Sequence, residues 1–269
     1  MADTTTAFTG YVPENYDRYM GPMFFEPYAR DMALRVAASG PREVLELACG
    51  TGRVTAAMRE VLPVAATLTA TDLNPAMIAC ARAKRSMPSE IRWRQADAQQ
   101  LPFDDESFDA VVCQFGFMFL PDKPRGLSEA YRVLRRGGRF LFSTWDSLQE
   151  NPLGAEAHGF LVSRFPDDPP QFMVTPFGWN DAEEITGLVR SAGFSLVRSE
   201  FLPMRARSPA ARDIALGLLV GSPASAQIAA RGVKPEELVD GFATRLRNRH
   251  GDGAIDTPMQ AIVFDAVKA

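Results

Sequence analysis

The stretch that decides the fold runs from Val44 to Gly52 and reads VLELACGTG. Its first half is short and apolar, which is typical of a buried strand, here expected over 43–48. Its second half places Gly50 and Gly52 two residues apart, so the backbone can turn sharply and approach a ligand closely. In open α/β sheets, ligands bind outside the carboxyl ends of the strands. We therefore expect a strand that ends in a ligand-binding loop.

The residues of this loop do not match two common phosphate-binding motifs. The pattern G-x-G-x-x-G fails because residue 55 is Thr, and the pattern G-x-x-x-x-G-K-[ST] fails because no Lys follows. The acidic side chain of Glu46 would repel a pyrophosphate but would suit an ammonium or sulfonium ion. The loop is therefore shaped for close approach to a ligand, but it lacks the pattern of a phosphate-binding loop.

Strands and helices alternate on both sides of this stretch, which predicts parallel βαβ units with right-handed crossovers. The predicted fold is α/β: a Rossmann-like, seven-stranded, mostly parallel sheet with helices on both faces. The predicted strands are 43–48, 65–71, 91–95, 108–114, 139–145, 195–201 and 261–267. The predicted helices are 24–38, 53–62, 75–86, 124–135 and 180–191, the last capped by Asn180.

Two late segments, 148–177 and 208–250, do not follow the alternation. We expect them to form a mainly helical cap over the carboxyl ends of the strands; the alternative is peripheral packing. The expected domains are an N-terminal arm and helix over 1–40 that acts as a lid, a cofactor-binding core over 41–147, and a completion of the sheet with the cap segments over 148–269.

Two further acidic residues follow predicted strands. Asp72 comes 26 residues after Glu46, where a carboxylate can accept hydrogen bonds from ribose hydroxyls. The alternative for Asp72 is a cap for the helix that Pro75 opens. Asp97 and Ala98 follow the third strand, where the carboxylate can accept from an adenine amine; the alternative is a turn residue.

Apolar side chains near the same strand ends complete the expected site. Met77 and Ile78 are candidates for packing on an adenine face, with core packing as the alternative. Gln114 ends the fourth strand near the reversal of strand order, and Phe115 and Phe117 are expected to wall the site.

Four of the five tyrosines lie in the N-terminal arm, and a tyrosine suits a half-buried lid because it offers a ring and a hydroxyl. Tyr16 and Tyr19 are the expected ligand contacts. The alternative is ordinary docking of a terminal helix.

Composition excludes several other classes. The net charge is −4 and no dense Lys/Arg run is present, so no nucleic acid partner is expected; the arginines at 132, 135, 136, 245, 247 and 249 are expected on solvated helix faces. No signal peptide and no membrane-spanning run is evident. Cys49, Cys80 and Cys113 are expected to be free reduced thiols of a cytoplasmic protein. With only His158 and His250 as imidazoles, no metal site is expected.

Taken together and in order, these motifs resemble those of class I S-adenosylmethionine-dependent methyltransferases, especially the ubiquinone/menaquinone-type and other small-molecule enzymes. The resemblance covers about residues 40–145. It is carried by Val44–Gly52, Thr71-Asp72-Leu73, Asp97-Ala98 with Leu101-Pro102-Phe103, Phe108–Val112 and Glu129–Gly138. The Asn/Asp-Pro-Pro-aromatic tetrad of enzymes that methylate nucleic-acid amines is absent after the fourth strand, which argues against a DNA-adenine substrate.

The resemblance implies S-adenosylmethionine as the cofactor, with the loop 46–52 at its methionine end. Ala48 departs from the glycine that many relatives carry, and we expect its methyl group to be tolerated. The residues expected around the cofactor are Tyr16, Tyr19, Glu46, Ala48, Gly50, Gly52, Asp72, Leu73, Met77, Asp97, Ala98, Gln114 and Phe115.

The implied reaction is methyl transfer to an O, N, S or C nucleophile of a small molecule. The late segments contribute Phe160, Phe165, Phe172 and Phe177, and Trp179 follows closely after the first of these segments; these side chains favour a hydrophobic or aromatic acceptor. His158 is a candidate general base, with a purely structural role as the alternative. Two competing functions are a non-catalytic S-adenosylmethionine-binding protein and, less favoured, a nicotinamide-dependent dehydrogenase. The sequence leaves the oligomeric state open.

Overall fold

A computed structural model describes residues 10–84, 87–88 and 90–269 of the chain. The chain divides into two compact units, each built from several segments. The sheet unit comprises Tyr28–Trp145, Trp179–Leu202 and Ala261–Ala269. The helical unit comprises the arm up to Pro27 together with Asp146–Gly178 and Pro203–Gln260.

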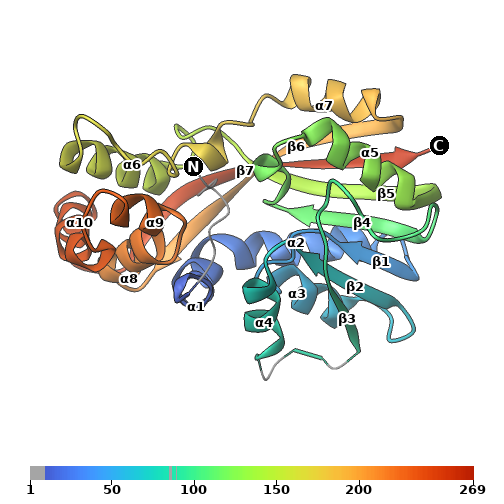
Figure 1. The fold of residues 1–269 in the computed structure, drawn as a ribbon, viewed down its shortest axis with the longest axis horizontal. Coiled ribbons are helices and arrows are strands. Elements are labelled where there is room, and N and C mark those ends of the chain that lie inside the picture. The colour runs from blue at the N-terminus through green and yellow to red at the C-terminus, as the bar shows by residue number, and fades with distance from the viewer. Residues whose placement is uncertain (1–9, 85–86, 89) are drawn as a thin grey trace. The chain divides into compact units, whose positions relative to one another are not determined.

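The sheet has seven strands in the order β3-β2-β1-β4-β5-β7-β6, which confirms the predicted fold (Figure 1). Strands β1 to β5 pair in parallel, whereas β7 runs antiparallel to β5. The order of strands reverses between β1 and β4, and that is where such sheets bind ligands. The strands are β1 Glu43–Glu46, β2 Thr67–Asp72, β3 Ile91–Gln95, β4 Phe108–Gln114, β5 Leu134–Trp145, β6 Phe194–Ser208 and β7 Ile255–Lys268.

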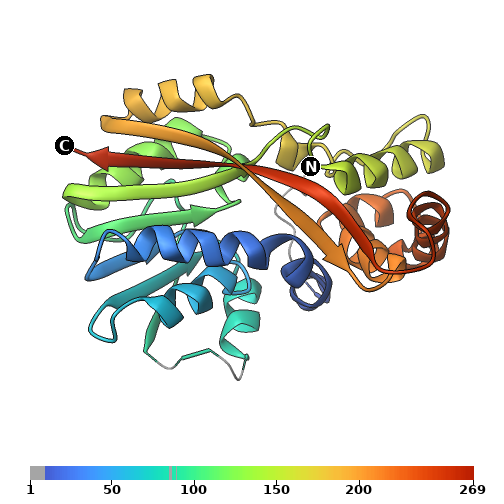
Figure 2. The same cartoon turned by 180° about the vertical axis from the view of Figure 1, so that it is seen from behind.

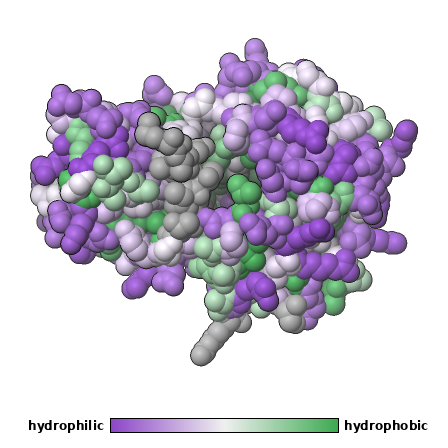
Figure 3. Space-filling model, viewed as in Figure 1, coloured by the Kyte–Doolittle hydropathy of each residue, from purple (hydrophilic) through white to green (hydrophobic). Residues whose placement is uncertain are grey.

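Helices cover both faces of the sheet because successive side chains of a strand point to opposite faces. In β5, Leu141 packs with one set of helices, α2 (Glu26–Ala37), α3 (Arg53–Val61) and α4 (Pro75–Arg82) (Figures 1 and 2). Its neighbours Phe140 and Phe142 point to the other face, where α5 (Lys123–Val133) and α7 (Ala182–Ser191) lie. Figure 3 shows mostly hydrophilic residues on the visible surface around α5, as expected for a helix with one buried stripe.

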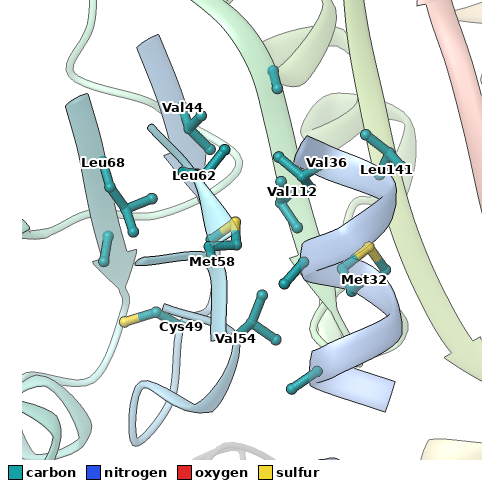
Figure 4. Packing of buried hydrophobic residues seen from close by; sticks show 14 of the residues in the cluster. Met32, Val36, Val44, Cys49, Val54, Met58, Leu62, Leu68, Val112 and Leu141 are labelled. Atoms are coloured by element: carbon teal, nitrogen blue, oxygen red, sulfur yellow. The ribbon is translucent and has the colours of Figure 1, made fainter. Parts of the chain in front are cut away.

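The core between the sheet and α2 and α3 is made of aliphatic and sulfur-containing side chains (Figure 4). Met32 of α2 and Met58 of α3 are fully buried against the strands. Burial of one such side chain contributes about 1.5–3 kcal/mol, so this layer fixes β1, β2 and β4 in register. The residues labelled in Figure 4 are Met32, Val36, Val44, Cys49, Val54, Met58, Leu62, Leu68, Val112 and Leu141.

The predicted helix over 124–135 is wrong at its end, because β5 already begins at Leu134, which pairs with Phe108 of β4. Arg135 and Arg136 therefore lie on a strand and not on a solvated helix face. With Arg42 they line a cavity of about 360 Å³ at the amino-terminal edge of the sheet. The arginines at 245, 247 and 249 do lie on a helix, α10 (Pro235–His250).

Strands β6 and β7 are longer than the predicted 195–201 and 261–267. Both continue from the sheet unit into the helical unit, where the unit boundaries fall within the strands. There, Arg205 and Arg207 of β6 form ion pairs with Asp256 of β7, with Nε–Oδ distances of 2.5 and 3.1 Å. In both extensions buried and exposed residues alternate with the period of two that a strand requires, so the predicted bounds of these two strands were too short.

From Val12 onward the N-terminal arm is helical, in contrast to the predicted helix, which began only at Phe24. α1 (Val12–Asn15) runs into a π-helical segment, η2 (Tyr16–Phe25), and then into α2. Pro13 occupies the first turn, where its missing N–H costs nothing. Pro22 lies inside the π-helical segment, whose altered hydrogen-bond pattern accommodates it.

The remaining helices of the helical unit come from the two late segments. The segment 208–250 is mostly helical, as expected, whereas 148–177 holds one helix and a short 3-10 turn. These elements are α6 (Pro152–Arg164), η4 (Thr175–Phe177), α8 (Ala211–Ala215), η5 (Leu216–Val220), α9 (Ala224–Ala229) and α10. Their role as a cap stays a prediction.

The cap of α7 also differs from expectation. Asp181, and not Asn180, accepts hydrogen bonds from the backbone N–H groups of Glu183 and Glu184 at 2.9 and 3.0 Å. A carboxylate at this position also suits the positive end of the helix dipole.

Candidate functional site

The loop after β1 is held in a strained conformation. Ala48, Gly50 and Gly52 all have a left-handed backbone, with φ angles of 50°, 55° and 78°. Glycine adopts this conformation without strain, whereas the methyl group of Ala48 makes it costly. The loop is fixed by backbone hydrogen bonds of 2.9 Å from Cys49 N to Thr71 O and from Gly52 N to Cys49 O.

The carboxylate of Asp72 joins the ends of β1 and β2. Its Oδ2 accepts a hydrogen bond from the N–H of Gly50, and its Oδ1 accepts one from the N–H of Asn74, both at 2.8 Å. Helix α4 is capped by Asn74, whose side chain accepts from Ala76 N at 2.9 Å. The capping alternative for Asp72 is therefore wrong, and its ribose role stays a prediction.

Glu46 lies beneath this loop and is almost completely buried. Its Oε2 accepts a hydrogen bond of 2.6 Å from Thr55 Oγ1. Burial, with a smaller contribution from the nearby Asp72, raises the pKa of Glu46 to about 8, and burial also raises the pKa of Asp72. Within the described residues, no Lys, Arg or His nitrogen forms an ion pair with either carboxylate. Among the described residues, the two buried acids of this site therefore have no ion-pair partner.

Lys84, which the sequence analysis missed, lies two residues after the end of α4 and supports the loop. Its Nζ donates a hydrogen bond of 2.6 Å to the carbonyl oxygen of Thr51. Close packing on the same side also explains Gly52: a Cβ atom there would lie 2.7 Å from Cε of Met87 and 3.0 Å from Cβ of Ala81. No local pattern links Lys84 to the loop, because the contact spans 33 residues.

The end of β3 is brought to the same edge by a backbone hydrogen bond from Ala96 N to Asp72 O at 3.0 Å. Asp97 is half-buried, and its Oδ1 accepts a hydrogen bond from Gln99 N at 2.8 Å. Its neighbour Ala98 is also half-buried, and Leu73 is 53% exposed beside Asp72. Their cofactor roles stay predictions.

The two apolar candidates on α4 are both buried. Ile78 belongs to the core cluster under the sheet, which supports the core-packing alternative for this residue. Met77 is 4% exposed and lies outside that cluster, so its place near an adenine stays a prediction.

After β4, three expected site residues have different environments. Gln114 is half-buried at the end of the strand. Phe115 has a left-handed φ of 55° and stacks on Trp145 with ring centroids 4.0 Å apart, while Tyr28 meets it edge-on at 5.4 Å. Phe117 is fully buried in the core of the α5 face, so it packs the interior of the sheet unit.

Tyr16, Tyr19 and His158 lie in the helical unit. The ring of Tyr16 stacks on Phe25 at 4.9 Å, and the ring of Tyr19 lies 5.2 Å from the guanidinium of Arg18. His158 is half-buried on α6, and its Nδ1 has no hydrogen-bond partner among the described residues. The lid role of the tyrosines and the base role of the histidine stay predictions.

The other imidazole has a clear structural contact, because His250 Nε2 lies 2.9 Å from Oε1 of the buried Glu156.

In the described part of the chain, no group of three His, Cys, Asp or Glu side chains is arranged to hold a metal ion. Across the same residues, no helix combines the length and apolarity needed to span a membrane. No disulfide bond joins Cys49, Cys80 and Cys113, and burial raises the pKa of Cys113 to about 12, so its thiol is protonated.

The loop, Asp72 and Asp97 all lie within the part of the chain that is similar to known proteins. Residues 45–142 match the methyltransferase domain family. The chain is 31% identical over 180 residues to the ubiquinone/menaquinone biosynthesis C-methyltransferase UbiE of Rhizobium etli, a match that covers 60% of this chain and 70% of that protein. The chain belongs to the class I S-adenosylmethionine-dependent methyltransferases.

Other members of this methyltransferase family are similar over a shorter region. A demethylmenaquinone methyltransferase of Thermus thermophilus is 43% identical over 114 residues, which cover 42% of this chain and 50% of that protein. The chain thus spans about half the length of the first curated relatives it matches.

A solved structure shares the fold of this chain. Phosphoethanolamine N-methyltransferase 2 of Haemonchus contortus, solved with S-adenosylhomocysteine, superposes with a TM-score of 0.60 at 18% identity, covering 100% of this chain and 60% of that one.

Proposed function

We propose that this chain transfers the methyl group of S-adenosylmethionine to a small aromatic molecule. The observation that carries the proposal is the pair of buried acids, Glu46 and Asp72, beside a loop shaped for close approach. Buried carboxylates are costly unless a positive charge compensates them. S-adenosylmethionine carries an ammonium and a sulfonium, so its charges and those of the site are complementary.

The chain's own residues have distinct roles in this proposal. The loop from Glu46 to Gly52 holds the methionine end, Asp72 accepts from the ribose hydroxyls, and Asp97 accepts from the adenine amine. When bound, S-adenosylmethionine supplies a methyl group on a positively charged sulfur, ready for attack by a nucleophile. The protein aligns that nucleophile and excludes water.

The names of the relatives support an aromatic acceptor and methylation at carbon. UbiE of Rhizobium etli is a C-methyltransferase of ubiquinone and menaquinone biosynthesis, and the Thermus thermophilus protein methylates demethylmenaquinone. The helical unit carries further aromatic side chains, including Phe160 and Phe172. We propose that the reaction takes place in the cytoplasm.

Two other functions make different predictions. A nicotinamide-dependent dehydrogenase would bring a pyrophosphate towards Glu46 and Asp72, which like-charge repulsion opposes. A non-catalytic binding protein would take up S-adenosylmethionine without forming a methylated product. Both alternatives are therefore open to a direct test.

The test combines ligand binding with product detection. S-adenosylhomocysteine should stabilise the protein by about 2.7 kcal/mol at 100 times its dissociation constant. NAD at the same concentration should have little effect. A panel of hydroxylated aromatic compounds, incubated with methyl-labelled S-adenosylmethionine, should then give a labelled product by mass spectrometry. An equal or larger stabilisation by NAD would contradict the proposal. Tight cofactor binding without any labelled product across the panel would favour the non-catalytic alternative.

A further inference from the structure

Lys123 and Trp179 meet beyond the carboxyl end of β4, within the sheet unit. Lys123 is the first residue of α5, which follows β4 through the short turn η3 (Phe117–Phe119). Trp179 lies three residues before the start of α7. In open α/β sheets this end of the strands is the one that binds ligands, so both residues belong to the functional side of the fold.

In the described part of the chain, no carboxylate lies within ion-pair distance of the Lys123 ammonium. Its Nζ lies 5.4 Å from the centroid of the Trp179 ring and donates a hydrogen bond of 3.1 Å to the carbonyl oxygen of Leu120. An ammonium has three donors, so this contact leaves donors unused. Burial lowers the pKa of Lys123, an effect that the charge of Glu184 opposes. Among the described residues Lys123 forms no ion pair.

Trp179 offers a second unused donor at the same place. Its side chain is more than nine-tenths buried, and its ring lies nearly parallel to those of Phe117 and Phe142, with centroids 6.5 and 6.2 Å away. Its Nε1–H is buried and has no hydrogen-bond partner among the described residues. Buried N–H donors are normally satisfied, and an exception calls for a partner such as a ligand or a water molecule.

We propose that Lys123 and Trp179 recognise an anionic oxygen, a carboxylate or a phenolate, on the aromatic methyl acceptor. The ammonium supplies the charge and the indole N–H supplies a directed hydrogen bond, while Phe117 and Phe142 pack against the Trp179 ring and hold it in place. That the bound molecule is an aromatic methyl acceptor rests on the proposed function; that the pair binds an anionic oxygen does not.

The physical reason for selectivity is desolvation. An ammonium that has lost part of its hydration gains more from an anion than a fully hydrated one, because the local dielectric constant is lower. A neutral acceptor of the same shape would leave the charge unpaired. The pair should therefore discriminate by charge more than by size.

The experiment measures binding of benzoate and of its neutral analogue benzamide by calorimetry, with S-adenosylhomocysteine present and absent. The wild type should bind benzoate at least about tenfold more tightly than benzamide. Lys123→Met should remove this preference, whereas Lys123→Arg should keep it to within about threefold. Trp179→Phe keeps an aromatic ring but removes the N–H, and it should weaken benzoate binding about three- to tenfold.

A second pair of probes distinguishes the two sources of the anion. 4-Nitrophenolate and its neutral methyl ether are compared at a pH where the phenol is ionised. A preference for the phenolate alone would assign the site to phenols, and a preference for benzoate alone would assign it to aromatic acids; either supports the site. Arg94→Met is the matched control, because Arg94 lies over the Phe103 ring at 5.0 Å and is exposed; it should change none of these affinities.

Equal affinities for the charged and neutral members of both pairs, including no binding by any of them, would overturn the inference. Retention of the charge preference in Lys123→Met would overturn it as well. Affinity for S-adenosylhomocysteine serves as the check of folding and should stay within about threefold in all variants. If S-adenosylhomocysteine does not bind while benzoate binds selectively, the proposed function fails and the anion site stands.

Discussion

Thr55 Oγ1 donates a hydrogen bond of 2.6 Å to Oε2 of Glu46. Thr55 stands where a dinucleotide-binding loop would carry its third glycine, so the residue that breaks that motif is the one that holds the buried acid. Both side chains are almost completely inaccessible to solvent. The departure from the glycine pattern is therefore part of how this loop places a carboxylate under a ligand.

Stability without ligand should fall as pH rises, because of Glu46. Its folded-state pKa of about 8 lies above the ordinary value of 4.5, so the folded state holds the proton more tightly and loses stability between these two pH values. A pKa difference of one corresponds to about 1.4 kcal/mol. Glu46→Gln should therefore be more stable than the wild type at pH 9 by roughly 2–4 kcal/mol. Urea unfolding at pH 5 and pH 9 measures the difference.

The pH dependence of Glu46→Gln itself is the control. Because the pKa of Asp72 is also raised, the stability of this variant should still fall as pH rises, but less steeply than that of the wild type. A wild-type stability that stays level from pH 5 to pH 9 would show that Glu46 is ionised throughout.

Thr55→Val should make cofactor binding more sensitive to pH. The Thr55 hydrogen bond lowers the pKa of Glu46, so its loss raises that pKa further and keeps the acid protonated at pH 9, where the wild-type acid is mostly ionised. A ligand that brings an ammonium then has to displace the proton, which weakens binding by up to about tenfold per pH unit below the pKa. Calorimetry with S-adenosylhomocysteine at pH 9, in buffers of different ionisation enthalpy, should show greater proton release in Thr55→Val. Equal proton release in both proteins would contradict this account.

Asp72→Ala should weaken cofactor binding by at least about tenfold, because hydrogen bonds to a charged group are worth roughly 1.5–3 kcal/mol each. The matched control is Asn74→Ala, two residues away, which removes the cap of α4. That variant should cost about 1 kcal/mol of stability and leave the affinity within a few-fold. Titration with S-adenosylhomocysteine and thermal unfolding separate the two effects. If both variants lose affinity equally, Asp72 acts through the loop and does not contact the ribose.

Ala48→Gly should leave stability unchanged or raise it by up to about 1 kcal/mol. A left-handed alanine costs about 1–2 kcal/mol, and glycine removes this strain at the expense of a more flexible unfolded chain. The control is Ala57→Gly in the middle of α3, which should destabilise by about 1 kcal/mol. Denaturant unfolding compares them, and equal destabilisation by both would mean that Ala48 is not strained.

Phe172→Leu should separate the acceptor from the cofactor. Phe172 is buried in the helical unit, and its backbone N–H donates to Gln227 Oε1 at 2.9 Å. The substitution should lower methyl transfer or change which acceptors react, since misplacement by about 1 Å can cost roughly 100-fold in rate. Affinity for S-adenosylhomocysteine should stay within a few-fold. The exposed Phe201, changed to Leu, is the control and should alter neither. Parallel loss of cofactor affinity in Phe172→Leu would assign the helical unit to the cofactor site.

Sequence by itself determined the sheet, the loop from Glu46 to Gly52 and the acid at Asp72. These features depend on interactions between residues close in the chain: an apolar run, a turn that needs glycine, and a polar residue directly after a strand. The alternation of strands and helices then allowed few topologies, because parallel crossovers have one hand. The pattern also predicted that a ligand binds at the carboxyl ends of the strands, whereas the order of the strands came from the structure.

Tertiary structure alone decided the features that depend on distant partners. Leu134 begins a strand because Phe108 lies beside it, although helix-forming residues precede it. Asp181 caps α7 in place of Asn180, and the arm before Phe24 is helical. Lys84 reaches Thr51, and Lys123 lies over Trp179, across separations that no local pattern encodes. Packing and desolvation also set the charge of Glu46, because a carboxylate's pKa depends on what surrounds it and not on its neighbours in sequence.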